Sequence, residues 1–227
     1  MGLLAIALLP FSRRLHQAFR VKSSHILLGF YDLSTGKGSS KSAKLLKFLI
    51  LVTIPVIVIG ALFKITGLIE MLRTIEVIGW TMVIFGVFLY LADRYSTQER
   101  TEFSLNRRHI IVLGLWQSLA LIPGTSRAGA TITAGLLLGY KRRNAVRISM
   151  LMAIPTIFAS GVYESYEIWQ TKNSIPINDV ALVTVLTFIF ALLALSVMMR
   201  LLNKINFTPY VIYRIILGLL LLGLAYS

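Results

Sequence analysis

Long apolar stretches alternate with short polar segments along the chain, a pattern typical of a polytopic membrane protein. A helix needs about 20 mostly apolar residues to cross about 30 Å of hydrocarbon. Within the stretches, Gly79 and Gly86 are expected at helix–helix contacts because small residues let helices approach closely. The pattern therefore predicts an all-α fold, a polytopic bundle of membrane-spanning helices. The predicted spans are residues 45–63, 77–92, 148–163, 180–199 and 207–226, the last interrupted only by Arg214.

Residues 110–140 form a further apolar stretch that holds a single charge, Arg127. As one helix this stretch would be about 46 Å long, too long for one span, whereas two complete spans need about 40 residues. Pro123 and Gly124 interrupt it near the middle. We therefore predict a re-entrant pair of half-helices, residues 110–121 and 130–138. Their turn would lie inside the membrane, enclosed by protein or water.

The charged segments place both ends of this pair on one side of the membrane. A mixed loop is predicted at residues 93–109, and the segment from Lys141 to Arg147 is basic, whereas a loop predicted at residues 164–179 is acidic on balance. The positive-inside rule places basic loops in the cytoplasm. Residues 9–45 are interpreted as a further basic loop. At residues 93–95, Asp-Arg-Tyr ends a span and is interpreted as a charge pair at the membrane edge.

Composition supports a bilayer environment and excludes several classes of function. Of the 227 residues, 56% are hydrophobic and 14% are charged. The formal net charge of +14 would suit nucleic acid. However, Lys and Arg stand in short clusters between apolar runs, so we expect a membrane and no nucleic acid as partner. Without cysteine there is no thiolate metal site or cysteine nucleophile. The sequence fixes no oligomeric state and leaves a homodimer open.

The turn between the two half-helices carries groups that suit a phosphate-type anion. Gly124 and Gly129 allow close backbone approach, and a helix that begins just after Arg127 presents free N–H groups to the turn. Arg127 adds a permanent charge whose planar fork matches phosphate oxygens. Intramembrane charge is costly and usually functional, which favours a binding site over the alternative that Arg127 only bonds carbonyls of the turn. Further phosphate-binding groups are expected from Thr125, Ser126, Thr131 and Gln117, although Gln117 suits an interhelical bond equally well.

A base and a metal site are harder to find in the sequence than the anion site. A phosphoester hydrolase needs a base, commonly with a divalent metal that carboxylates hold. All nine carboxylates lie at segment ends or in predicted loops, and the three histidines, also in predicted loops, lack partners at metal-ligand spacing. We therefore identify no metal ligand. The carboxylates are Asp32, Glu70, Glu76, Asp93, Glu99, Glu102, Glu164, Glu167 and Asp179.

At these residues the chain resembles the undecaprenyl-diphosphate phosphatase family of the bacitracin-resistance type. That family dephosphorylates a polyprenyl pyrophosphate lipid carrier to the monophosphate for cell-wall synthesis. The resemblance runs from about Gly2 to the C-terminus. It rests mainly on Gln-Ser-Leu-Ala-Leu-Ile-Pro-Gly-Thr-Ser-Arg at 117–127 with Gly-Ala-Thr-Ile at 129–132. Three shorter matches support it: residues 149–155, Phe-Thr-Pro at 207–209 with Tyr213 and Arg214, and Thr-Ile-Pro at 53–55 ahead of Gly60.

The resemblance implies a hydrolase of the bacterial inner membrane with an inverted-repeat fold and two re-entrant hairpins. On this basis residues 1–227 form a single integral membrane domain, with an incomplete first repeat in 1–109 and a second repeat in 110–227. Ser126 and Arg127 would be the catalytic serine and arginine. A divalent cation, Mg²⁺ or Ca²⁺, and a polyprenyl pyrophosphate lipid are the implied cofactor and substrate.

Three departures from the family bear on activity. Family members begin with a further hairpin that carries a Glu-x-x-x-Glu motif and a Pro-x-Ser-Ser-x-Gly-His turn, and this sequence starts after them. Ala128 replaces the usual serine after the arginine, and Arg147 stands where the family often has an acidic or neutral residue. Because the missing hairpin supplies the family's carboxylates, we expect impaired hydrolysis. The alternatives are an inactive remnant that binds lipid pyrophosphate, and a lipid or anion transporter.

Overall fold

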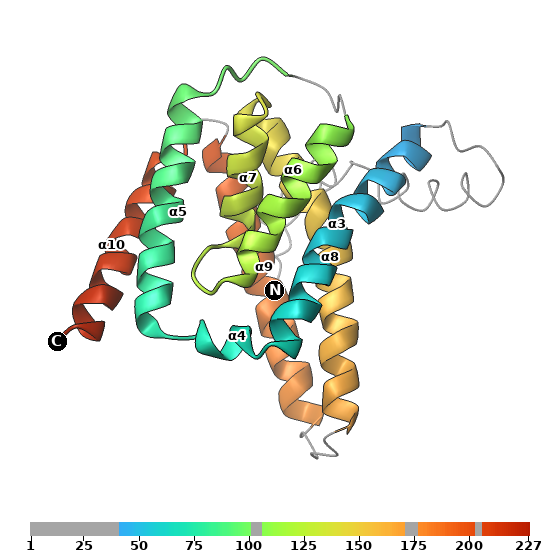
Figure 1. The fold of residues 1–227 in the computed structure, drawn as a ribbon, viewed down its shortest axis with the longest axis vertical. Helices are drawn as coiled ribbons and strands as arrows, with labels where there is room; N and C mark the ends of the chain where they lie inside the picture. The colour runs from blue at the N-terminus through green and yellow to red at the C-terminus, as the bar shows by residue number, and fades with distance from the viewer. Residues whose placement is uncertain (1–40, 101–105, 171–176, 203–205) are drawn as a thin grey trace, which may run out of the picture. The chain divides into compact units, whose positions relative to one another are not determined.

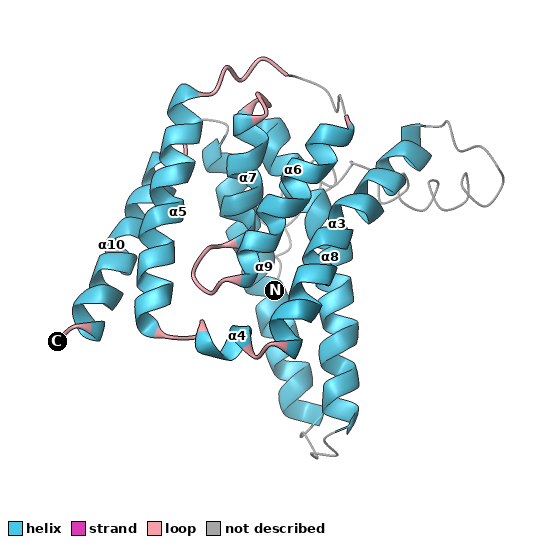
Figure 2. Cartoon of the chain, viewed as in Figure 1, coloured by secondary structure: helices cyan, strands magenta, loops and turns pink. Residues whose placement is uncertain are grey.

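The computed structural model describes residues 41–100, 106–170, 177–202 and 206–227, and in these ranges the chain is helical apart from short turns (Figures 1 and 2). The chain divides into two compact units, Met1–Ile50 and Leu51–Ser227; the helix Lys41–Ile65 contributes to both, and the contacts described below belong to the second. The elements are α3 (Lys41–Ile65), α4 (Leu68–Met71), α5 (Ile75–Tyr95), α6 (Arg107–Ser118), the 3-10 turn η1 (Leu119–Leu121), α7 (Arg127–Leu137), α8 (Arg142–Gln170), α9 (Ile177–Leu202) and α10 (Thr208–Ala225).

The predicted spans agree with long apolar helices at four of five places. Within the described residues, four helices are long and apolar enough to cross a membrane: Ala43–Ile65, Ile75–Tyr95, Arg142–Tyr166 and Thr208–Ala225. The fifth predicted span falls in α9, where the apolar part among these residues is the shorter segment Leu182–Ala194. The all-helical membrane fold is thereby confirmed.

Two predicted loops are shorter than expected. The acidic loop expected at residues 164–179 is largely helical, because α8 continues to Gln170 and α9 begins at Ile177. The mixed loop expected at residues 93–109 also ends early, because α6 begins at Arg107. In both cases the helices include charged residues that flank the apolar stretch. The basic loop expected at residues 9–45 lies outside the described residues except for the start of α3.

Helices α5 and α10 pack tightly against each other in antiparallel directions. Gly79 lies against Gly218 and Leu222, so that a Cβ atom on Gly79 would be 3.1 Å from the carbonyl oxygen of Gly218. One heptad further along α5, Gly86 lies against Ile215 of α10. The two glycines expected at helix contacts are therefore confirmed in that role.

The apolar stretch at residues 110–140 is broken into two short helices, as its pattern predicts. Helices α6 and α7 have 12 and 11 residues, and each is too short to cross a membrane alone. The first predicted half-helix, 110–121, corresponds to α6 with η1, and the second, 130–138, begins three residues earlier, at Arg127. The turn between them lies beside α5 (Figure 2). Helix α7 also packs against α6 and α8.

Candidate anion-binding site

The turn is fastened to α5 at its first residues. The hydroxyl of Thr81 donates a hydrogen bond to the carbonyl oxygen of Pro123 over 2.6 Å. Gly124 has a φ angle of 86°, in the left-handed region that favours glycine. A Cβ atom at this position would also collide with the Thr81 hydroxyl and lie 2.6 Å from the carbonyl oxygen of Ile78. Glycine is therefore required here for both its conformation and its small size.

Arg214 of α10 fastens the second part of the turn. Its side chain is 3% exposed, and its Nη2 donates to the carbonyl oxygens of Gly124 (2.7 Å) and Thr125 (3.0 Å). Those carbonyls would otherwise be buried without a donor, which is costly. Arg214 thus makes the bonds to carbonyl oxygens of the turn that the structural alternative assigned to Arg127. It lies 90 positions further along the chain than Gly124.

Ser126 occupies a strained position at the start of α7. Its backbone has φ 63° and ψ 110°, a conformation that a residue other than glycine adopts rarely and that is often found at functional sites. As the N-cap of α7, its Oγ accepts a hydrogen bond from the backbone N–H of Gly129 over 3.3 Å. The same Oγ lies 3.1 Å from the hydroxyl of Tyr210 on α10. The serine hydroxyl is thereby held between two helices.

Arg127, the first residue of α7, is more exposed than Arg214, and a guanidinium nitrogen of each arginine, including Nε of Arg214, is buried without a partner among the described residues. Arg127 is partly buried, and within the described part of the chain its Nη1 has no hydrogen-bond partner. A buried guanidinium with an unused donor is costly unless an acceptor is supplied from elsewhere. The N-terminus of an eleven-residue helix lies beside it. An oxyanion is the group that satisfies both features.

The structure brings five of the predicted site residues together and directs two others elsewhere. Gly124, Thr125, Ser126, Arg127 and Gly129 form one continuous turn and helix start. The Oγ1 of Thr125 is buried without a partner among the described residues. The hydroxyl of Thr131, in contrast, lies 2.9 Å from the Arg127 carbonyl oxygen and 2.6 Å from Ser149 Oγ on α8. Gln117 donates through Nε2 to Thr156 Oγ1 on α8 over 3.0 Å, which realises the interhelical alternative.

Three residues of this arrangement were not predicted as site residues. Thr81, Tyr210 and Arg214 reach the turn from α5 and α10. A signal existed for Arg214, because it is the single charge inside the last apolar stretch and such charges are usually functional. Thr81 and Tyr210 carry no comparable signal, since a threonine or tyrosine in an apolar helix is common.

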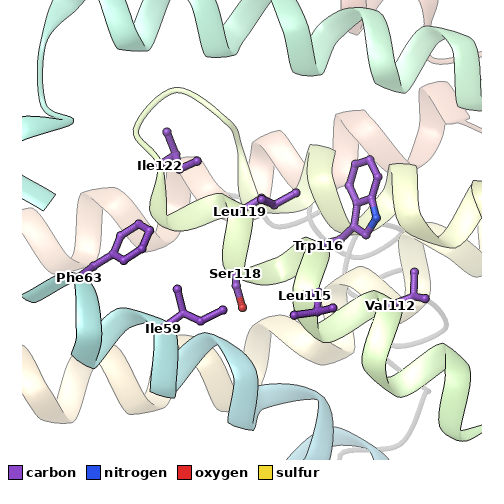
Figure 3. A pocket seen from close by; sticks show the side chains of 8 residues that line it. All are labelled: Ile59, Phe63, Val112, Leu115, Trp116, Ser118, Leu119 and Ile122. Atoms are coloured by element: carbon purple, nitrogen blue, oxygen red, sulfur yellow. The ribbon is translucent and has the colours of Figure 1, made fainter. Parts of the chain in front are cut away.

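An apolar pocket of about 320 Å³ lies between α3, α6 and η1 (Figure 3). Its lining consists of aliphatic and aromatic side chains together with Ser118, whose hydroxyl donates to the Gly114 carbonyl oxygen over 3.0 Å. No charged residue lines it, so it does not suit a phosphate. It extends to Ile122, the residue before Pro123, and therefore provides apolar surface next to the turn.

The described residues do not form a divalent-metal site. No group of three His, Asp or Glu side chains comes together in this part of the chain. Asp93 is buried, but its carboxylate accepts hydrogen bonds from Arg142 Nε and from the backbone N–H of Phe207. The charge pair expected at residues 93–95 therefore forms with α8. His109, expected in a loop, lies in α6 with its ring nitrogens 2.6 Å from Arg100 Nη1 and 2.8 Å from the Tyr140 hydroxyl.

Comparison with known proteins gives a consistent result over most of the chain. The family described as bacitracin resistance protein BacA matches residues 8–220. An undecaprenyl-diphosphatase of Ruegeria pomeroyi is 51% identical over 203 residues, which cover 88% of this chain and 75% of that protein. Undecaprenyl-diphosphatases of Jannaschia sp. and Dinoroseobacter shibae are 48% and 47% identical, covering 88% and 92% of this chain and 75% and 78% of theirs.

Proposed function

The chain belongs to the bacitracin resistance protein BacA family, and we propose that it dephosphorylates undecaprenyl diphosphate in the bacterial inner membrane. In this reaction water cleaves the P–O–P bond of the lipid, and the products are undecaprenyl phosphate and inorganic phosphate. The observation that carries the proposal is the partly buried Arg127 at the start of α7, whose Nη1 has no partner within the described residues. A terminal phosphate is the acceptor that fits this position.

The chain's own groups can bind the diphosphate at three points. The Arg127 guanidinium donates to phosphate oxygens as a planar fork. The first N–H groups of α7, on Arg127 and Ala128, have no acceptor within the helix and point into the turn. The Ser126 hydroxyl, held at the same helix start, contacts the phosphate as the catalytic serine that the family resemblance implies. Two hydrogen bonds to α8 hold the half-helices in place: Thr131 joins α7 to α8, and Gln117 joins α6 to α8.

We place the turn inside the membrane as a re-entrant hairpin. Thr81, which bonds Pro123, lies six residues after the start of the apolar helix α5, and this corresponds to a depth of about 9 Å along that helix. Arg214 and Thr81 supply donors to three carbonyl oxygens of the turn, as irregular backbone at that depth requires. The apolar pocket beside Ile122 provides a surface for hydrocarbon next to the proposed phosphate position.

We propose that hydrolysis of the lipid diphosphate is slow, because the described residues bring no base to Ser126. The hydroxyl of Tyr210 lies 3.1 Å from Ser126 Oγ, but general bases are most often histidine or carboxylate side chains, and none of these contacts Ser126 among the described residues. Asp93 is engaged with Arg142. The divalent cation that the resemblance implies, Mg²⁺ or Ca²⁺, finds no ligand set in these residues, so no step is assigned to it. Binding of the lipid diphosphate without turnover is therefore the second candidate function.

Phosphate release from undecaprenyl diphosphate in detergent micelles tests both candidates. We expect residues 1–227 to release phosphate about 100-fold more slowly than the R. pomeroyi relative, because a general base contributes about 10²- to 10⁴-fold. Ser126→Ala should lower the remaining rate to background, whereas Ser160→Ala, which changes an exposed serine of α8 bonded to Ile157, should leave it unchanged. The mass of the particle in the same preparation decides whether the chain forms the homodimer that the sequence leaves open.

A rate equal to that of the relative would show that a base is present within this chain and would contradict the proposed impairment. Equal rates for Ser126→Ala and the unmodified chain would remove Ser126 from the reaction. Undetectable release together with tight binding of the lipid would select the second candidate.

A further inference from the structure

The end of the hairpin remote from the turn carries an excess of positive charge. Segments 93–109 and 141–147 contain eight Lys or Arg side chains and three carboxylates, Asp93, Glu99 and Glu102, the last outside the described residues. Asp93 is buried and bonded to Arg142. Seven of the cations are exposed, and one of them, Arg100, contacts His109. The other six are named the basic rim: Arg94, Arg107, Arg108, Lys141, Arg143 and Arg147.

Hydrogen bonds hold the parts of the basic rim together. The Asp93–Arg142 pair joins the end of α5 to the start of α8. The backbone N–H of Arg100 donates to the Gly139 carbonyl oxygen over 2.9 Å, and the backbone N–H of Lys141 donates to the Arg100 carbonyl oxygen over 3.1 Å. Figure 1 shows the end of α5 and the starts of α6 and α8 on the same side of this unit. The segments that carry these cations therefore lie at one end of this unit, although they are far apart in the sequence.

The basic rim lies where membrane headgroups are expected. The apolar helix α5 ends at Tyr95, directly after Arg94, and the apolar helix of α8 begins at Arg142, directly before Arg143. The ends of spanning helices coincide with the boundary between hydrocarbon and headgroups. Long basic side chains at this level reach the phosphate layer.

Within the described parts of segments 93–109 and 141–147, the basic rim is accompanied by two carboxylates, the buried Asp93 and the exposed Glu99. The first turns of α6 and α8 contain no acidic residue, although the N-terminus of a helix favours negative charge. Arg107 and Arg108 occupy the first turn of α6, and Arg143 lies in the first turn of α8. Arg143 and Arg147 stand four residues apart on the same face and repel each other. Anionic groups outside the chain would be attracted to this arrangement.

We propose that the basic rim binds the phosphate headgroups of anionic phospholipids, the chemistry of phosphatidylglycerol or cardiolipin, in the leaflet that it faces. Electrostatic attraction to anionic headgroups accumulates with each Lys or Arg near the membrane surface. The bound lipids hold the end of α5 and the starts of α6 and α8 together, which fixes the base of the hairpin that carries the turn. This lipid site is independent of the proposed diphosphate site, because it lies at the other end of α6 and α7.

The test compares thermal unfolding of the chain in nanodiscs of phosphatidylcholine with and without about one third phosphatidylglycerol. We expect a higher unfolding midpoint with phosphatidylglycerol, and a loss of at least half of this difference in about 0.5 M NaCl because salt screens the contact. The triple variant Arg107→Gln, Arg108→Gln, Arg143→Gln should show at most half of the difference, and its affinity for phosphatidylglycerol should fall at least fivefold. Arg73→Gln, an exposed arginine just before α5, serves as the control and should behave as the unmodified chain.

Equal midpoints for the unmodified chain in both lipids would overturn the proposal, and so would a difference that salt leaves unchanged. A triple variant that responds to phosphatidylglycerol as fully as the unmodified chain would also overturn it. If the triple variant does not fold, the proposal is tested by the effect of salt on the unfolding midpoint of the unmodified chain. Arg127→Ala should retain the full response to phosphatidylglycerol, which separates this site from the diphosphate site.

Discussion

Arg127→Ala should lower the affinity of the chain for undecaprenyl diphosphate by about 100-fold and leave its stability unchanged. A hydrogen bond to a charged group contributes about 1.5–3 kcal/mol, so two bonds from the guanidinium to phosphate oxygens account for about 3 kcal/mol or more. The stability should not fall, because Arg127 Nη1 has no partner among the described residues and its removal leaves no protein group unpaired there. The lipid affinity of Arg127→Lys should lie between those of Arg127→Ala and the unmodified chain, because lysine keeps the charge and loses the planar fork.

Lipid binding in nanodiscs and thermal unfolding of the same preparations measure the two halves of this prediction. The matched control is Arg73→Ala, an exposed arginine outside the turn, which should bind as the unmodified chain. If Arg127→Ala unfolds at a markedly lower temperature, the guanidinium holds the turn together and the structural alternative is correct. If it is stable and binds the lipid normally, Arg127 is not part of the anion site.

Arg214→Met, unlike Arg127→Ala, should destabilise the chain by about 3 kcal/mol. The substitution preserves much of the side-chain volume but leaves the carbonyl oxygens of Gly124 and Thr125 without their donor. Each buried acceptor left unpaired costs about 1–3 kcal/mol. A lower unfolding temperature, by about 10 °C, should therefore be seen in the absence of any ligand. Lipid affinity should fall as a consequence, because the turn is no longer held in place.

Tyr213→Phe is the matched control for this variant, because the exposed Tyr213 is the neighbour of Arg214 on α10. It should change neither unfolding nor binding. If Arg214→Met is as stable as the unmodified chain and yet fails to bind the lipid diphosphate, Arg214 contacts the ligand directly. The two arginines would then share one role, and the division between a binding and a positioning arginine would be wrong.

The elements of the fold could be predicted because their signals are local. Apolar length identifies α3, α5, α8 and α10, and Pro123 with Gly124 identifies the break between α6 and α7. The start of α7 was predicted three residues late. The reason is that Ser126 serves as the N-cap in a left-handed conformation, which side-chain preferences for serine do not indicate.

The contacts of the site could not be predicted because they join residues far apart in sequence. Ser126 and Tyr210 are separated by 84 positions, and Asp93 and Arg142 by 49. A single sequence does not show which face of one helix meets which face of another. For the same reason Thr131 was expected at the phosphate, whereas its hydroxyl lies against Ser149. The five residues of the turn were identified correctly as neighbours because they are neighbours in the chain.

The turn should recognise the diphosphate of the lipid and not its hydrocarbon chain. The most direct measurement is the affinity of residues 1–227, in nanodiscs, for undecaprenyl diphosphate and for undecaprenol, which share the same chain. We expect a preference of about 100-fold for the diphosphate, because contacts with its phosphate oxygens contribute about 3 kcal/mol. Equal affinity for the two lipids would contradict it.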